Sequence, residues 1–174
     1  YQGDHNGTVS KLNKNNKIIN THWIFNIDRR LPMKEVIPHL IDMQKNKNKD
    51  SMHKKDGMLN YFSYADTATK QISLCLFRQT TFSNLSADEK YFMKRETADI
   101  SKIEINEDLL LLNGKSIELY ELQAQLSKTR PSEENSEPTV QLFIEEKTQY
   151  QDYLQVKVYL EAHDILTDST EYLI

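Results

Sequence analysis

The stretch TVQLFIEEKTQYQDYLQVKVYLEAHDI, residues 139–165, changes its apolar period midway and thereby predicts two different elements. In its first part the apolar residues of one strand face recur at every second position: Val140, Leu142 and Ile144. From residue 149 onward they recur every four residues, as on one side of a helix: Tyr150, Leu154 and Val158. Glu145, Glu146 and Lys147 lie between the two patterns, so we interpret them as a strand-to-helix turn rather than as acid-base chemistry.

The segments around this stretch complete a pattern of mixed strands and helices. The final TEYLI, residues 170–174, predicts a last strand, and a strand-helix-strand order favours a parallel unit. Upstream, ISKIEIN and LLLLNGKSI predict two strands, or a strand and a bent continuation, with a turn at Asn113 and Gly114. ELYELQAQLSK then predicts an amphipathic helix. We expect an α+β fold with small mixed sheets and helices packed on one face.

The first half predicts a related unit. Residues 18–28 have the pattern of a strand and residues 33–44 have helical spacing, although Pro38 should kink or delay that helix. MLNYFSY and KQISLCLF flank a turn at residues 65–67 and predict a hairpin. An offset of 117 residues (144 − 27) places Ile27 over Ile144 and Met33 over Tyr150 without a gap. This indicates either a degenerate duplication or one larger α+β domain with two unrelated units.

We divide the chain into four ranges on this basis. Residues 1–17 are polar and predict a flexible lead-in. Residues 18–82 form the first α+β unit, and residues 83–99 form a connector with a capping-box pattern at Ser86 and Glu89. Residues 100–174 form the second α+β unit, which would be one of two similar subdomains if the duplication is real.

Composition narrows the class of protein. The chain has 174 residues and a net charge of −4, which argues against a nucleic-acid partner because phosphate recognition needs a concentrated basic surface. The only basic block, residues 45–55, predicts a solvated loop. No stretch approaches the roughly 18 apolar residues of a membrane span. The chain begins with Tyr1 rather than methionine, so we expect a fragment or processed product, which leaves an upstream signal peptide or anchor open.

Catalytic patterns are missing from the sequence. None of the five histidines has a metal-binding partner at zinc-ligand spacing, and four isolated glycines cannot form a phosphate-cradling loop. Adjacent carboxylates on a strand point to opposite faces and do not converge on a substrate. Asp28 and Arg30 have the pattern of a turn cap rather than of an anion site. We therefore predict no catalytic, cofactor-binding or metal-binding residues.

Residues 100–174 resemble the periplasmic domain of the ExbD/TolR family. The resemblance lies in IEINEDLLLLNGKSIELYELQAQL, in VQLFIEEKTQYQDYLQVKVYLEAHDI and in a closing strand. The positions that match the family pattern are Asn113, Gly114, Leu119, Leu122, Glu145, Lys147 and Tyr150. The family usually has Ala-Asp at the strand-to-helix turn and a glycine after the long helix, whereas this chain has Glu145-Glu146 and His163-Asp164.

The resemblance implies a non-enzymatic domain of a proton-driven energy-transduction complex for biopolymer transport. Such a domain lies on the periplasmic side of the bacterial inner membrane, behind one N-terminal membrane helix that is absent from this sequence. Its implied partners are an ExbB/TolQ-like channel protein, a TonB/TolA-like protein and a second copy of itself. Open sheet edges suit partner binding, and as an edge-strand candidate we take Tyr172, Leu173 and Ile174.

Two other hypotheses remain open. One is a secreted or surface α+β binding module with an unknown ligand, which the acidic composition allows. The other is a small enzyme that uses Asp28, Arg30 and a histidine. A structure in which these side chains do not line one pocket would remove the enzyme hypothesis.

Overall fold

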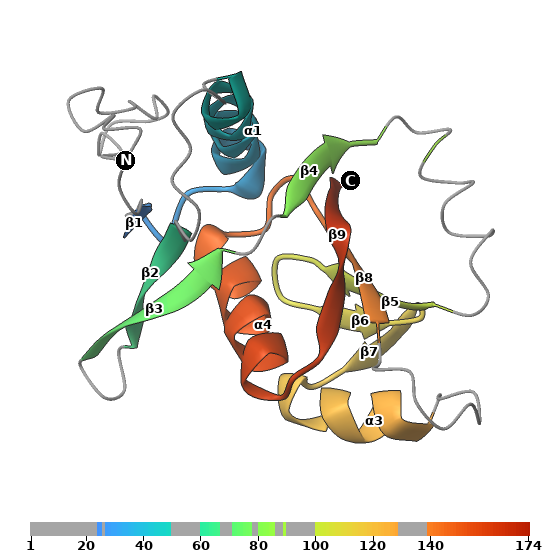
Figure 1. The fold of residues 1–174 in the computed structure, drawn as a ribbon. Helices are drawn as coiled ribbons and strands as arrows, with labels where there is room; N and C mark the ends of the chain where they lie inside the picture. Colours follow the sequence, from blue (N-terminus) through green and yellow to red (C-terminus); the bar gives the residue numbers. More distant parts are fainter. Residues whose placement is uncertain are drawn as a thin grey trace.

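The protein folds into two sheets with helices between and beside them (Figure 1). The structure, a computed structural model, describes residues 24–25, 27–49, 60–66, 71–77, 80–85, 89, 100–128 and 139–174. Within these ranges, the strands form a three-stranded sheet and a six-stranded sheet. The predicted α+β class is confirmed.

The larger sheet contains strands from both halves of the chain. Its order is β4 (Thr81–Asn84), β9 (Leu166–Leu173), β8 (Thr139–Ile144), β5 (Ser101–Ile105), β6 (Leu110–Leu112) and β7 (Lys115–Ile117). The first four run parallel to their neighbours, whereas β5, β6 and β7 are joined by antiparallel pairing. The predicted mixed sheet is therefore present.

The opening stretch of the sequence forms β8 and α4 (Tyr150–Ala162), and β9 follows parallel to β8. The predicted strand face, Val140, Leu142 and Ile144, belongs to the hydrophobic core. Phe143 is also buried, but it stacks on Tyr172 with ring centroids 5.3 Å apart. Because neighbouring side chains of a strand point to opposite faces, this stack lies on the sheet face away from the core helices.

The β6–β7 hairpin is built on a two-residue turn. Asn113 and Gly114 have φ values of 51° and 78°, and positive φ at both central residues is typical of the type I′ turn that fits the twist of a hairpin. After β7, a 3-10 helix, η3 (Leu119–Glu121), continues into α3 (Leu122–Lys128), which buries Leu122 and Leu126. The predicted turn and helix are confirmed.

The first half supplies the three-stranded sheet and a long helix. In that sheet, β1 (Ile24–Phe25) runs parallel to β2 (Asn60–Asp66), and β2 pairs antiparallel with β3 (Gln71–Phe77). The predicted hairpin is thus confirmed, although residues 65–66 are part of β2 rather than of the turn. The helix α1 spans Met33–Lys49 and buries Met33, Val36, Ile37 and Leu40.

The structure corrects two expectations for α1. Pro38 was expected to kink or delay the helix, and the delay is wrong because the helix begins at Met33 and continues through Pro38, which lies on its exposed side and whose missing N–H affects only one carbonyl of the first turn. The helix also runs on to Lys49, so residues 45–49 of the predicted solvated loop are helical. The predicted lead-in lies outside the described residues, and so does most of the connector, of which only residues 83–85 and 89 are described.

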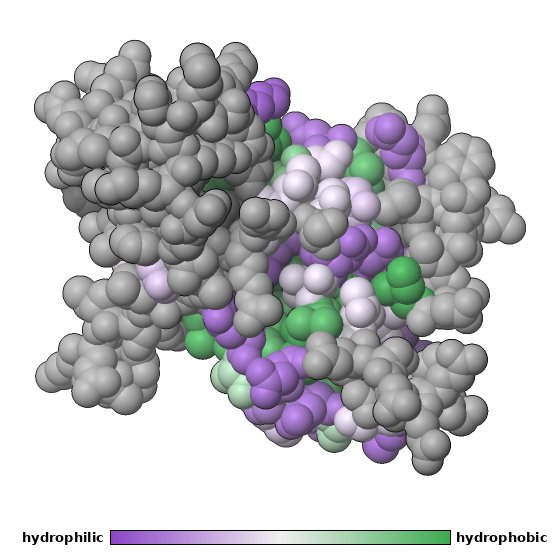
Figure 2. Space-filling model, in the orientation of Figure 1, coloured by the Kyte–Doolittle hydropathy of each residue, from purple (hydrophilic) through white to green (hydrophobic). Residues whose placement is uncertain are grey.

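One hydrophobic core joins the two halves. It combines buried residues of α1, α3 and α4 with one face of β5 and β8, and it includes Phe82 of β4. The helices therefore pack on one face of the six-stranded sheet. In Figure 2 the described surface on the viewed side is a mixture of purple and white residues with separate green areas. Among the described residues, no helix is long and apolar enough to cross a membrane.

Candidate functional site

The carboxyl ends of the parallel strands are the first place to look for a site. Ile105, Ile144 and Leu173 end β5, β8 and β9 and lie side by side in the pairing register. In open sheets of parallel strands, ligands bind in the crevice outside these ends. The groups that lie at this edge therefore determine whether a ligand could bind there.

The charged turn at residues 145–148 covers this edge through its backbone. The Glu145 N–H donates to the Ile105 carbonyl at 2.9 Å, and the hydroxyl of the fully buried Thr148 donates to the same oxygen at 2.8 Å. The Ile174 N–H donates to Ile144 at 2.8 Å, and Glu146 donates to Ile174 at 3.0 Å. The side chain of Glu146 is exposed, so the predicted role as a turn is confirmed.

The equivalent turn of the first half binds to the second one. Pro32 and Gln149 form an isolated antiparallel bridge. Among the described residues, two backbone hydrogen bonds run in each direction: Met33 N to Thr148 O at 2.8 Å, Lys34 N to Glu146 O at 2.9 Å, Tyr150 N to Leu31 O at 2.8 Å and Gln151 N to Arg29 O at 2.9 Å. We call the contact between residues 29–34 and 146–151 the junction. It satisfies N–H groups at the starts of α1 and α4 that a helix leaves without internal partners.

Asp28 and Arg30 bond to each other where the junction begins. The Asp28 carboxylate accepts from the Arg30 guanidinium at 2.6 and 3.0 Å and from the Arg30 backbone N–H at 3.0 Å. The hydrogen bond and the charge of Asp28 raise the pKa of Arg30. This arrangement is that of a turn cap. His39 lies on α1 and His163 follows α4, while the other three histidines lie outside the described residues.

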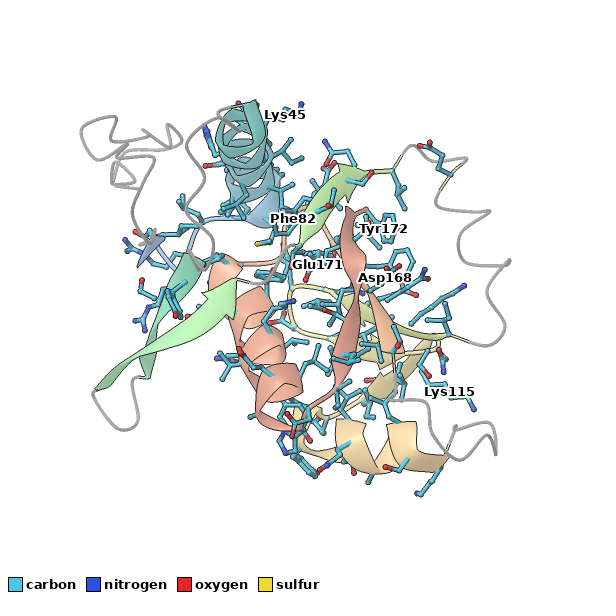
Figure 3. The ribbon with its side chains drawn as sticks, in the orientation of Figure 1. Lys45, Phe82, Lys115, Asp168, Glu171 and Tyr172 are labelled. Carbon is cyan, nitrogen blue, oxygen red and sulfur yellow. The ribbon has the colours of Figure 1, made fainter. Side chains whose placement is uncertain are left out.

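A buried carboxylate links β9 to α4. Figure 3 shows the Glu171 side chain on the α4 side of β9 and those of Asp168 and Tyr172 on the opposite side. Glu171 is fully buried and accepts a hydrogen bond from the Tyr153 hydroxyl at 2.7 Å. The Lys157 ammonium is 2.5 Å from the other carboxylate oxygen. This cluster fixes the last strand to the helix.

Sequence reasoning missed this cluster, although a signal was present. Tyr153 and Lys157 are four residues apart and therefore lie on one side of a helix. Glu171 is two residues before the buried Leu173 and shares its strand face. When a lysine lies on the apolar side of a helix and an acidic residue lies on the apolar face of the strand that packs against it, the two are expected to form a buried ion pair.

The other face of β9 is polar and partly buried. The Gln141 amide donates to the Asp168 carboxylate at 3.4 Å. Burial and the charge of Asp168 raise the pKa of the Tyr172 hydroxyl, and a hydrogen bond with Thr170 works in the opposite direction. Tyr172 is thus a neutral, stacked side chain near neutral pH.

The edge-strand premise for Tyr172, Leu173 and Ile174 is wrong. Tyr172 and Leu173 pair with β4 on one side and β8 on the other. The Ile174 N–H donates to the carbonyl of Ile144 at the end of β8, and its carbonyl accepts from the Glu146 N–H in the turn that follows. The outer strands of this sheet, as far as the structure describes it, are β4 and β7. The error arose because the four-residue strand β4, with Phe82 as its one buried residue, has too short a pattern to be recognised.

Comparison of the chain with protein-family models, curated proteins and solved structures gave no match. Within the described part of the chain, no group of three or more histidine, cysteine or acidic side chains lies close enough to hold a metal ion. The arrangement of the described residues thus offers buried packing and backbone pairing at the strand ends.

Proposed function

We propose that the chain is a non-enzymatic, ExbD/TolR-like periplasmic domain of a proton-driven energy-transduction complex for biopolymer transport. The domain would be anchored in the inner membrane by a helix outside this sequence. It would act as a homodimer beside an ExbB/TolQ-like channel protein and a TonB/TolA-like protein. The proposal rests on one observation: residues 101–173 contain a three-strand hairpin region, a helix, a strand, a helix and a last strand in the order that the resemblance implies.

The matching residues support this proposal because they occupy element boundaries. Asn113 and Gly114 form the hairpin turn, Leu122 is the buried first residue of α3, and Tyr150 is the buried first residue of α4. At the end of α4, where the family pattern has a glycine, Asp164 has a φ of 52°. Glycine favours this left-handed region and aspartate tolerates it, so the departure in sequence preserves the backbone requirement.

The closed strand ends support the non-enzymatic part of the proposal. The edge at which parallel sheets usually place a ligand is covered by the turn at residues 145–148 and by the junction. The nearby Asp28 and Arg30 are paired with each other in a turn. This pairing favours a structural role for Asp28 and Arg30 over a role in acid-base chemistry.

Membrane attachment and channel binding test the proposal. The full-length gene product, tagged at its C-terminus, should fractionate with inner membranes and co-purify after crosslinking with an ExbB/TolQ-like channel subunit. A matched form without its upstream apolar segment should be released from the membrane and lose the channel subunit. A gene that encodes no upstream segment of about 20 apolar residues, or a full-length protein that never binds the membrane, would contradict the proposal.

A further inference from the structure

The two halves of the junction have the same local hydrogen bonds at one offset. Within the first turn, Leu31 N donates to Asp28 O at 3.1 Å, and 117 residues later Thr148 N donates to Glu145 O at 3.0 Å. The two helices also begin 117 residues apart (150 − 33), at Met33 and Tyr150. The alignment derived from apolar residues alone thus gives the same pairs as the backbone.

The bonds across the junction are exchanged by the same offset. If each residue is replaced by the one aligned with it in the other half, the bond from Met33 N to Thr148 O becomes the bond from Tyr150 N to Leu31 O. In the same way, the bond from Lys34 N to Glu146 O becomes the bond from Gln151 N to Arg29 O. Pro32 and Gln149, which form the bridge, are aligned with each other, so the same replacement leaves this pair unchanged. A contact in which residue i meets j and j meets i is isologous, which is the geometry of a two-fold interface between identical surfaces.

Burial and strand pairing follow the same relation. The aligned pairs Met33 and Tyr150, Val36 and Tyr153, and Ile37 and Leu154 are all buried. Pro38 and Gln155, which are also aligned, are both exposed. Each helix joins two parallel neighbours, β1 and β2 in the first half and β8 and β9 in the second. The similarity therefore extends from the turns to whole strand-helix-strand units.

We propose that residues 146–151 form a self-complementary docking surface, and that its occupant is residues 29–34 of a second, degenerate copy of the same unit within this chain. The protein is thus an internal pseudo-dimer. This inference does not depend on the ExbD/TolR-like role. If that role is correct, two chains must associate through a surface other than the junction, because the first unit already fills it.

Proline substitutions test whether the two sides of the junction are equivalent. Gln149 has φ −70° and ψ 145°, which suits proline, and it is aligned with Pro32. Gln149→Pro and Pro32→Gln, alone and combined, should each lower Tm by no more than about 2 °C. Gln151→Pro and Lys34→Pro remove exchanged donors in the first turn of each helix, so each should lower Tm by about 4 °C or more.

The test rests on the contrast between the small loss of Tm expected at positions 32 and 149 and the larger loss expected at positions 34 and 151. A Gln149→Pro variant that loses as much Tm as Gln151→Pro would overturn the equivalence, as would Gln151→Pro and Lys34→Pro variants with the Tm of the parent. Circular dichroism of each variant at low temperature shows whether a loss of Tm occurs in a folded protein.

A disulfide tests which copy fills the surface. Pro32 and Gln149 form a non-hydrogen-bonded antiparallel pair, whose Cα atoms are typically about 4.5 Å apart and within disulfide range. The Cys75→Ala background removes the single natural cysteine of the chain. In this background the double variant with Pro32→Cys and Gln149→Cys should oxidise to a monomer that migrates faster in non-reducing gel electrophoresis. Gln149→Cys alone should remain a monomeric thiol. A double variant that in dilute solution oxidises mainly to disulfide-linked dimers would show that a second chain occupies the surface and would overturn the proposal.

Discussion

Removal of either partner of the buried Glu171–Lys157 pair should destabilise the protein by unequal amounts. Glu171 has no exposed surface, whereas 13% of the Lys157 side chain is exposed. Loss of one partner from a buried pair costs about 3–5 kcal/mol because the remaining charge is left buried and uncompensated. Lys157→Met leaves the Glu171 carboxylate with the Tyr153 hydroxyl, so it should have a cost in this full range.

Glu171→Gln should cost less, about 1–3 kcal/mol, because the long lysine side chain has a route to solvent and its ammonium can move outward. The amide oxygen of the new glutamine can still accept the Tyr153 hydrogen bond. The double variant should be more stable than Lys157→Met alone, because it no longer buries an unpaired carboxylate.

Urea unfolding at neutral pH measures these differences as changes in midpoint at constant slope. Lys115→Met, at an exposed position of β7, is the matched control and should lie within about 0.5 kcal/mol of the parent. The reasoning is refuted if Glu171→Gln is more costly than Lys157→Met, or if Lys157→Met is as stable as the control.

Three further changes test the turns and the start of α4. Thr148→Val should cost about 1 kcal/mol in urea unfolding, because the hydroxyl bond is lost but the Ile105 carbonyl keeps the Glu145 N–H; a cost below about 0.3 kcal/mol would count against that bond. Gly114→Ala should cost about 1 kcal/mol from the positive φ alone, since its new Cβ would meet nothing within 4 Å; a loss of several kcal/mol in a thermal melt would contradict this. Burial raises the pKa of Asp152, so its contribution to stability is present at low pH and is lost as pH rises through the folded-state pKa. The stability of Asp152→Asn relative to the parent should therefore increase from about pH 3 to about pH 7 in denaturant titrations, and an unchanged difference would refute the shift.

The sequence predicts the elements whose apolar period is long enough to recognise. The change of period at residues 139–165 correctly indicates β8, the turn and α4, since alternate residues of β8 and one side of α4 enter the same core. By contrast, β9 begins at Leu166, four residues before the predicted strand, because its first part is mostly polar. Its register against β8 is also irregular between Val140 and Leu142.

Long-range pairing explains the missed strand β4 and the edge-strand error. Thr81–Asn84 becomes a strand because β9 offers it a parallel neighbour more than 80 residues later in the chain, at the pairs from Thr81 with Thr170 to Asn84 with Leu173. Four residues with one buried phenylalanine carry no such information on their own. The edge-strand candidate at Tyr172 failed for the same reason, because the strand that covers it could not be identified.

The junction shows a different limit of sequence reasoning. Its contacts are backbone hydrogen bonds, and the aligned side chains differ in type, as Pro32 and Gln149 do. The apolar alignment nevertheless identifies the equivalent positions, because burial of Met33 and Tyr150 depends on where each helix begins. A two-fold contact can therefore persist while its exposed residues diverge, since every residue except proline has the same backbone donor and acceptor, and Pro32 lies at a position whose N–H the contact does not use.

Because the carboxyl ends of the parallel strands are covered, partners are expected to bind at other surfaces. The ends of β5 and β8, at which a parallel sheet would hold a ligand, are bonded to the turn at residues 145–148 and to residue 174, and the first unit is bonded to that turn. In the sheet as described, β4 and β7 are the outermost strands, and the outer side of such a strand has backbone N–H and carbonyl groups that the sheet itself does not pair. If the proposed role is correct, substitutions at the exposed positions Thr81 and Asn84 of β4 and Lys115 and Ser116 of β7 should alter binding to the channel or transport protein, without the loss of stability that substitutions in the junction would cause.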